Sequence, residues 1–245
     1  MRRITQFLLI AAVLLSCSTA WAQKLSDDPY YLTAEDVPNA VIWMPAPPVP
    51  GSTQYLADIA QYYWGKEQRL DPQRARDAVL HATADIAPMA ELFSPAFGME
   101  ISEQTTPATY RVLYKGTRTI RLSATKPKEA YMRLRPYVVF NEQTLIPDEE
   151  EELRNTGSYP SGHTARGWGM ALILTEINPA AQDELLKLGY EWGQSRVIAG
   201  YHWQSDVNAS RMLAAACYAR LHACPEFLAD MAAAREEFQR LSAAR

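Results

Sequence analysis

The octapeptide Gly157-Ser158-Tyr159-Pro160-Ser161-Gly162-His163-Thr164 leads into an apolar run at residues 168–177. Glycine and proline favour a turn here, and the apolar run predicts a buried helix that begins close to Ser161. Backbone N–H groups at a helix N-terminus have no partner inside the helix and carry partial positive charge, so this turn can bind an anion. Taken alone, the octapeptide is better explained by an ordinary helix cap at Ser161 and a surface histidine at His163.

Helical patterns also precede the octapeptide. Apolar spacing predicts helices at residues 53–65, from Pro72 to about residue 86, and from Pro107 through Ile120. Pro88 and Pro95 are expected to break the segment between the last two helices into short pieces. Residues 137–152 are expected to be non-helical, and their acidic run at residues 149–152 to be a solvated face, with bordering the site as the weaker alternative.

After His163 the chain is expected to be helical almost to its end. Asn178-Pro179 and Gly200 interrupt the pattern, and Pro225 begins a last helix. Strand signals are sparse and there is no internal repeat, so the sequence predicts an all-α, single-domain helical bundle over residues 53–245. The apolar face of the last helix is expected to be core and comprises Phe227, Leu228, Met231, Phe238 and Leu241.

The first 22 residues are typical of a secretory signal peptide. Two arginines precede an apolar run at residues 7–15, and Ala20-Trp21-Ala22 is a small-x-small cleavage pattern, so the mature chain is expected to begin at Gln23 in the periplasm. Cys17 offers the weaker alternative of a lipoprotein anchor. Residues 23–52 are rich in proline and are expected to form an extended segment lying over the domain rather than core.

The composition excludes some classes of function. Removal of residues 1–22 takes away two arginines and no acid, which changes the net charge from −4 to −6 and argues against sequence-independent nucleic-acid binding. No later stretch is long and apolar enough to predict a membrane span. Cys217 and Cys224 are too far apart on one straight helix for a disulfide, so their pairing stays open and requires the helix to end between them.

Two further clusters carry chemistry. Lys128 and Arg135 are seven residues apart on a predicted short helix and would project together, and Pro136 pushes Arg135 out of helical geometry at the helix end. In the other cluster, His202 and Asp206 would share one helix face if a helix begins near His202. The carboxylate would then accept the Nδ1–H of His202 and leave Nε2 free as a nucleophile. A solvated basic pair and a structural His–Asp pair are the competing explanations.

Together, the three clusters resemble the three-part signature of the type 2 phosphatidic-acid-phosphatase and vanadium-haloperoxidase superfamily. The octapeptide resembles the signature of its exported bacterial branch, the class A nonspecific acid phosphatases. The resemblance spans residues 128–206, and its fixed positions are all matched, at Lys128, Arg135, Pro136, Pro160, Ser161, Gly162, His163, Ser195, Arg196, His202 and Asp206.

The resemblance implies a role for each site residue. His202 would attack phosphorus and become phosphohistidine, Asp206 would orient it, and His163 would protonate the leaving oxygen and later activate water. The phosphoryl oxygens would be held by Lys128, Arg135, Ser161, Gly162 and Arg196. No metal or other cofactor is expected, and the four histidines show no pair at metal-ligand spacing; His81 and His222 are expected to be packing or surface residues.

The expected activity is that of a broad-specificity acid phosphatase that cleaves small phosphate esters, with possible phosphotransfer to alcohols, and the expected assembly is a homodimer or higher homo-oligomer. The alternatives are an apyrase-like nucleoside di- and triphosphate hydrolase, a vanadate-dependent haloperoxidase, and a phosphate-binding module without turnover. An aligned His202–Asp206 pair argues against the last alternative, because a pure binder gains nothing from a nucleophile.

Overall fold

The computed structural model describes residues 28–244, so the predicted signal peptide, its cleavage site and Cys17 lie outside the described residues. Within residues 28–244 the regular elements are helices, with no strand, which confirms the predicted all-α class. The elements are α1 Ala40–Trp43, α2 Thr53–Gln68, α3 Pro72–Leu80, α4 Ile86–Phe97, α5 Pro107–Leu122, α6 Thr125–Tyr131, α7 Pro136–Phe140, η1 Pro147–Glu149, α8 Glu150–Leu153, α9 Gly162–Ile177, η2 Pro179–Ala181, α10 Gln182–Ile198, α11 Gln204–Leu221 and α12 Pro225–Ala243.

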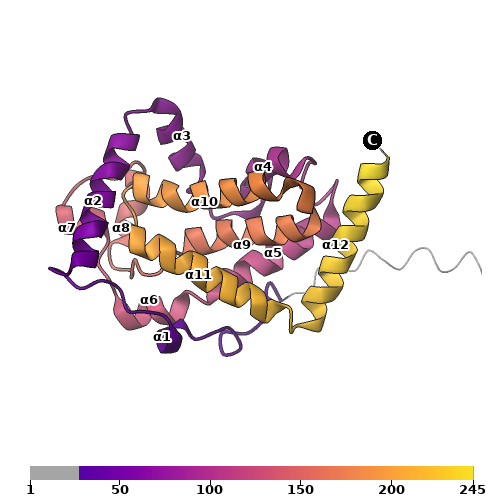
Figure 1. Cartoon of the computed structure of the whole chain (residues 1–245), viewed down its shortest axis with the longest axis horizontal. Helices are drawn as coiled ribbons and strands as arrows, with labels where there is room; N and C mark the ends of the chain where they lie inside the picture. The colour runs from indigo at the N-terminus through magenta and orange to yellow at the C-terminus, as the bar shows by residue number, and fades with distance from the viewer. Residues whose placement is uncertain (1–27, 245) are drawn as a thin grey trace, which may run out of the picture.

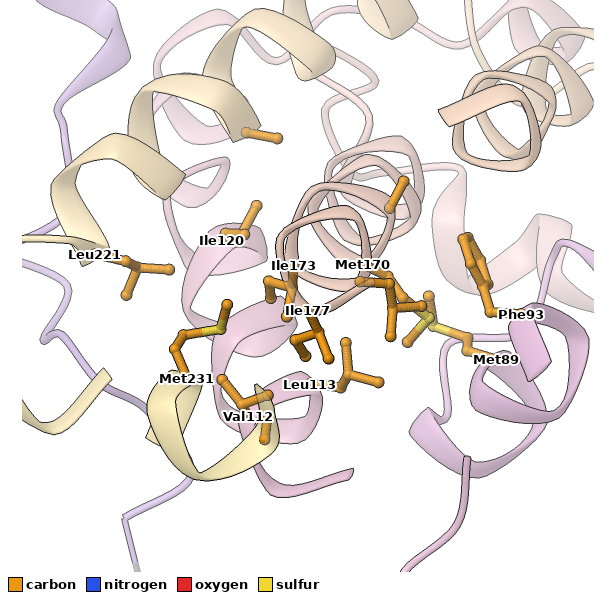
Figure 2. Close-up of a cluster of buried hydrophobic side chains, with 14 of the residues drawn as sticks. Met89, Phe93, Val112, Leu113, Ile120, Met170, Ile173, Ile177, Leu221 and Met231 are labelled. Atoms are coloured by element: carbon orange, nitrogen blue, oxygen red, sulfur yellow. The ribbon is translucent and has the colours of Figure 1, made fainter. Parts of the chain in front are cut away.

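Helix α9 is the centre of the bundle. It packs against α5, α10 and α11, and α12 crosses α5 at one end of the molecule (Figure 1). The apolar run predicted to be buried lies in this helix, and Met170, Ile173 and Leu174 are fully buried. Figure 2 shows their neighbours from α4, α5, α11 and α12 packed around them. Burial of α9 on all sides explains why its sequence lacks a polar face.

Glycine allows α9 and α10 to approach closely. A Cβ atom on Gly167 would lie 2.4 Å from two ring carbons of Trp192, and one on Gly189 would lie 2.5 Å from the Cβ of Ala171. Neither position can carry a side chain without moving the helices apart. The N-terminus of α9 and the C-terminal part of α10 both lie at the candidate active site. This close packing therefore fixes the two helices relative to one another there.

Two predictions about the first half of the chain are wrong. Pro88 and Pro95 both lie within one helix, α4. Pro88 is the third residue of α4, where the backbone N–H has no helical acceptor, and Pro95 lies in the last turn, so neither breaks the helix. The helix predicted to run from Pro72 to about residue 86 ends at Leu80, because a turn separates it from Asp85, the N-cap of α4.

Two segments predicted to lack helix or core also differ. Residues 137–152 contain α7, η1 and α8. The N-terminal segment enters the core at Tyr31, Leu32 and Val37, and it contains turns and the short helix α1, so it is not simply extended. The backbone N–H of Tyr31 donates to Thr119 Oγ1 at 2.9 Å, and its ring packs edge-on against Phe227. These contacts join residues about 90 and 200 positions apart in the chain, so local sequence carried no sign of them.

The C-terminal elements largely follow the pattern in the sequence. On α12, Phe227 and Met231 are buried, whereas Leu228 is 45% exposed and does not belong to the core face. Helix α11 ends before Cys224, yet Cys217 and Cys224 are both free thiols. None of the helices in residues 28–244 is long and apolar enough to span a membrane.

Candidate active site

The three sequence clusters meet at one cavity of about 900 Å³. Backbone hydrogen bonds tie them together: Ser158 N–H donates to Arg133 O at 2.9 Å, and Ser161 N–H donates to Asp206 O at 3.3 Å. The indole N–H of Trp203 donates to Leu134 O at 2.8 Å and links the Lys128–Arg135 cluster to the His202–Asp206 cluster. Six of the predicted site residues line the cavity, namely Lys128, Arg135, Gly162, His163, Arg196 and His202.

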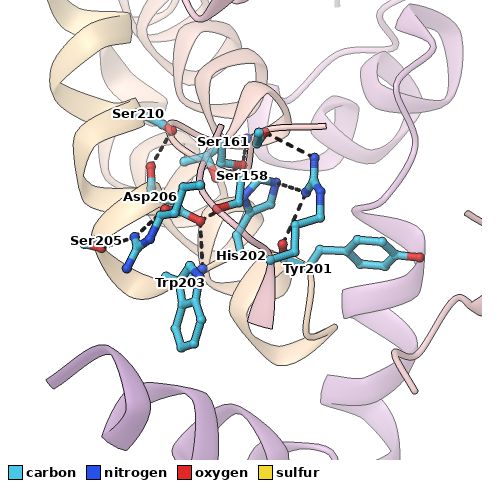
Figure 3. Close-up of polar contacts among 12 residues, drawn as sticks. Ser158, Ser161, Tyr201, His202, Trp203, Ser205, Asp206 and Ser210 are labelled. Carbon is cyan, nitrogen blue, oxygen red and sulfur yellow. Dashed lines mark hydrogen bonds and ion pairs between the residues drawn. The ribbon is translucent and has the colours of Figure 1, made fainter. Parts of the chain in front are cut away.

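Asp206 and His202 do form a pair, but not on one helix face. Helix α11 begins at Gln204, so His202 lies in the turn before it and Asp206 reaches back from the first turn. Asp206 Oδ2 accepts the Trp203 backbone N–H at 2.9 Å and lies 3.2 Å from His202 Nδ1 (Figure 3). A buried carboxylate beside Nδ1 favours the tautomer that carries its proton there, which leaves the lone pair on Nε2.

Lys128 and Arg135 reach the cavity from different elements, so the predicted shared helix is wrong. Helix α6 ends at Tyr131, and Met132 follows in the left-handed region. Arg135 is the extended N-cap residue of α7, as expected for a residue that precedes proline. Its Nη1 lies 3.2 Å from His202 Nε2, and its Nε donates to Leu153 O at 3.0 Å.

The octapeptide forms the turn and helix start that its sequence predicted. Ser161 is the N-cap of α9, and its Oγ accepts hydrogen bonds from Thr164 N–H at 3.2 Å and from Thr164 Oγ1 at 2.9 Å. Ser161 is fully buried behind the cavity wall. Gly162 is the first residue of α9 and lines the cavity, so the free N–H groups of the first helical turn lie beside any bound anion.

Arg196 is a buried cation without a hydrogen-bond partner. None of its three guanidinium nitrogens has one within residues 28–244, and its Nη2 lies 3.8 Å from Glu149 Oε2. The guanidinium lies over the ring of Tyr201, 4.7 Å from the centroid. Burial lowers the pKa of Arg196 to about 10. Since buried charges are normally paired, an unpartnered guanidinium at a cavity wall is suited to binding an anion.

Both cavity histidines are held neutral. Burial lowers the pKa of His163 well below its usual value of 6.5, and the charges of Arg196 and His202 lower it further. Burial and then Arg135 and Lys128 have the same effect on the pKa of His202. Burial and Arg135 also lower the pKa of Lys128 to about 7. A bound dianion would raise the pKa of each of these groups, so the cavity is electrostatically complementary to phosphate.

Comparison with known proteins agrees with this geometry. The PAP2 superfamily model matches residues 115–229. The non-specific acid phosphatase of Providencia stuartii is 42% identical over 215 residues, which cover 87% of this chain and 86% of the relative. That of Salmonella typhimurium is 40% identical over 211 residues, covering 85% and 83%. The chain belongs to the non-specific acid phosphatases of the PAP2 superfamily. The acid phosphatase of Zymomonas mobilis is also similar, at 30% identity over 82% of this chain and 76% of the relative.

The cavity of this phosphatase also contains residues that sequence reasoning missed. Arg121 of α5 is one of them. Glu149 and Glu152 also line the cavity, which corresponds to the weaker of the two alternatives that the sequence offered for the acidic run. Arg121 lies in an amphipathic helix outside the three clusters, so nothing in the sequence singled it out. Behind the cavity, Arg133 and Asp58 contact Asp206 directly or through one another.

The remaining histidines, His81 and His222, do not line the cavity. His81 is buried, stacks on Trp192 and lies 2.8 Å from Ser195 Oγ through its Nδ1. His222 is partly exposed and pairs with Glu176 at 3.0 Å. Across residues 28–244, no three His, Cys, Asp or Glu side chains gather closely enough to hold a metal ion.

Proposed function

We propose that the chain is an exported, broad-specificity acid phosphatase that hydrolyses nucleotides, sugar phosphates and aryl phosphates through a phosphohistidine at His202. The observation that carries the proposal is that His163 and His202 line one cavity together with Lys128, Arg135 and Arg196. A tetrahedral phosphoryl group there would contact a nucleophile, an acid and three cations at once.

In the first step, His202 Nε2 attacks phosphorus and the bond from phosphorus to the ester oxygen breaks. His163, protonated in the substrate complex, gives its proton to the leaving oxygen. Arg135 Nη1 lies 3.2 Å from Nε2 and donates to its lone pair. A bound phosphoryl oxygen would draw that donor away and free the nucleophile. Asp206 keeps the Nδ1 proton in place and stabilises the cationic phosphoimidazole.

In the second step, water attacks phosphorus while neutral His163 takes its proton. The bond from phosphorus to Nε2 breaks, inorganic phosphate forms, and His202 returns to its neutral state. An alcohol in place of water would give phosphotransfer. In both steps charge builds on the phosphoryl oxygens, and Lys128, Arg135, Arg196 and the N–H groups at the start of α9 are already arranged around them.

The test is labelling with a ³²P-labelled phosphate ester at pH 5–7 in the presence of a chelator, quenched with alkaline detergent because phosphohistidine is stable in alkali. Wild-type protein is expected to carry acid-labile label, and His202→Ala to carry none. His222→Ala is the matched control, because this histidine lies outside the cavity. Label retained in His202→Ala would refute the nucleophile, and halide oxidation after addition of vanadate would support a haloperoxidase instead.

A second candidate, an apyrase-like activity, is favoured by arginines on the leaving-group side. Arg166 lies close enough to His163 to lower its pKa, and Arg121 lines the cavity beside Gly162. Asp85 is a carboxylate on the same side. A leaving group that is itself a phosphate would bind these arginines. We expect Arg121→Gln to reduce kcat/KM for ADP about tenfold more than kcat/KM for p-nitrophenyl phosphate, because loss of one charged hydrogen bond changes an affinity by about that factor. Equal losses would contradict this candidate.

We also propose that residues 1–22 direct the protein to the periplasm and are removed, and that residues 53–245 form one phosphatase domain. Residues 28–52 add core contacts to that domain. The mature enzyme is proposed to be a homodimer or a higher homo-oligomer. N-terminal sequencing of periplasmic protein tests the first statement, and light scattering of the purified enzyme tests the last.

A further inference from the structure

We propose that Asp58 and Arg133 are positioning residues of the reaction, which hold Asp206 in the orientation and charge state that His202 requires. This inference rests on the proposed function and extends it to helix α2, outside the three clusters. Arg133 Nη1 donates to Asp206 Oδ1 at 2.6 Å, and Arg133 Nη2 donates to Asp58 Oδ2 at 2.7 Å. The pairs form a chain from α2 to the nucleophile.

The two oxygens of Asp206 have separate tasks. Oδ2 accepts the Trp203 N–H and faces His202 Nδ1, whereas Oδ1 is bound by Arg133. Because Arg133 holds Oδ1, the carboxylate plane cannot rotate away from the imidazole. A carboxylate bound only through Oδ2 could still rotate. Small changes in the position of an orienting group lower the reaction rate considerably.

Asp58 fixes Arg133 and the start of α11 together. Its Oδ1 accepts the Ser205 backbone N–H at 2.8 Å, and its Oδ2 accepts the Ser205 hydroxyl at 2.6 Å as well as Arg133 Nη2. The guanidinium also lies over the indole of Trp203, 5.2 Å from the ring centroid. Arg133 therefore has partners on each side and one available geometry.

The chain is buried, so its charges act strongly on Asp206. The side chains of Asp58, Arg133 and Asp206 are 3%, 8% and 0% exposed. Burial raises the pKa of Asp206, and Arg133 is the largest influence that lowers it. Lys128 also lowers the pKa of Asp206. Asp206 in turn favours the charged form of Arg135. With Arg133 present, the three-residue chain carries one net negative charge. That charge stabilises the cationic imidazole formed when His202 is phosphorylated.

Helix capping alone does not account for this arrangement. Asp206 already caps α11 through the Trp203 N–H. Burying two carboxylates around one arginine is costly compared with apolar packing, and replacement of such groups by apolar residues is often neutral or stabilising. A role in orienting Asp206 explains why a charged chain is found here.

The test compares Arg133→Gln, Arg133→Lys and Asp58→Asn with wild type, using p-nitrophenyl phosphate between pH 4 and 8. We expect Arg133→Gln to lower kcat about 10- to 100-fold, the size of losses from removing an orienting partner, with little change in KM. The acid limb should move up by about one pH unit or more, because Asp206 loses a cation that lowers its pKa. Arg133→Lys should restore part of kcat and of the acid limb, and Asp58→Asn should be intermediate.

Arg111→Gln is the matched control. Arg111 forms a similar ion pair, at 2.9 Å with Asp230, away from the cavity. The inference is overturned if Arg133→Lys and Asp58→Asn, like Arg111→Gln, change only thermal stability and leave kcat and the acid limb at wild-type values. Labelling of the wild type separates the two proposals: absence of phosphohistidine there refutes the proposed mechanism, whereas a wild-type label with unmoved variant profiles refutes only the positioning role.

Discussion

Replacement of Arg196 by methionine is expected to stabilise the fold while it abolishes activity. Arg196 is fully buried, and its guanidinium has no hydrogen-bond partner within residues 28–244. Glu149 attracts it from 3.8 Å and the Tyr201 ring lies 4.7 Å away, but burial still lowers its pKa from 12.5 to about 10. The folded state therefore holds this cation at a free-energy cost that methionine would not have.

The magnitude follows from that lowered pKa. One pKa unit corresponds to about 1.4 kcal/mol, so the fall to about 10 represents about 3 kcal/mol of lost stability. Because the folded pKa lies below the unfolded one, the cost applies in full at every pH below about 10 and disappears as pH rises toward 12.5. Loss of the contacts with Tyr201 and Glu149 offsets part of the gain. We expect a net increase of about 2 kcal/mol, or roughly 4–8 °C in Tm for a domain of this size.

The assay is thermal and urea unfolding of Arg196→Met beside wild type at pH 6, with kcat measured on p-nitrophenyl phosphate. Phosphate should raise Tm of the wild type and have a much smaller effect on the variant, since binding to the folded state stabilises it. The contrast is Arg135→Met, which should lose both activity and stability, because Arg135 donates to Leu153 O and Thr156 Oγ1. A Tm for Arg196→Met below that of wild type would refute the reasoning.

Four further outcomes are expected. The pH profile should have its optimum below neutrality, because the pKa of His163 is lowered and the acid form is lost as pH rises through it; an unchanged rate up to pH 9 would contradict this. Asp206→Asn should lower kcat by about 10²–10⁴, measured on p-nitrophenyl phosphate, since the amide favours the wrong tautomer. Gly157→Ala should lower both Tm and phosphate affinity, because its Cβ would lie 2.4 Å from Lys128 O. A reducing agent should leave Tm unchanged, and a thiol-specific reagent should react with both Cys217 and Cys224 in the denatured protein.

The sequence predicted which residues gather at the cavity better than the local geometry that holds them. His163, His202 and Arg196 all line one cavity, and the motifs that grouped them depend on residue type and spacing rather than on which helices carry them. The element under each residue was harder to predict. The sequence predicts Lys128 and Arg135 on one helix, but Met132 adopts a left-handed conformation that ends it, and residues with a Cβ rarely adopt that conformation.

Long-range pairs were beyond reach for a different reason. Asp58 and Arg133 are 75 positions apart; Asp58 belongs to no recognisable motif, and Arg133 lies at a position of the Lys128–Pro136 cluster that the signature does not fix. Each alone is indistinguishable from a solvated charge on a helix or turn. Proline signals were similarly ambiguous: Pro72, Pro107 and Pro225 each begin a helix, whereas Pro88 lies inside the first turn of one that had begun at Ile86. A proline therefore marks the start of a helix at some positions and is tolerated within the first turn at others, depending on where packing places the beginning of the helix.

Contacts within the protein hold the cations of the cavity in place. Arg135 is held by carbonyl oxygens, Lys128 donates to Gly157 O at 2.6 Å, and Arg196 is enclosed by packing. Apart from Arg135 Nη1, which turns from His202 Nε2 to the phosphoryl group when substrate binds, the donors do not have to reorganise as charge builds, and an environment of that kind lowers the barrier more than mobile side chains would. Burial, and then the charges of these cations, lower the pKa values of both histidines. A bound anion would offset the repulsion among these groups, so part of the energy that destabilises the free enzyme is returned when phosphate binds.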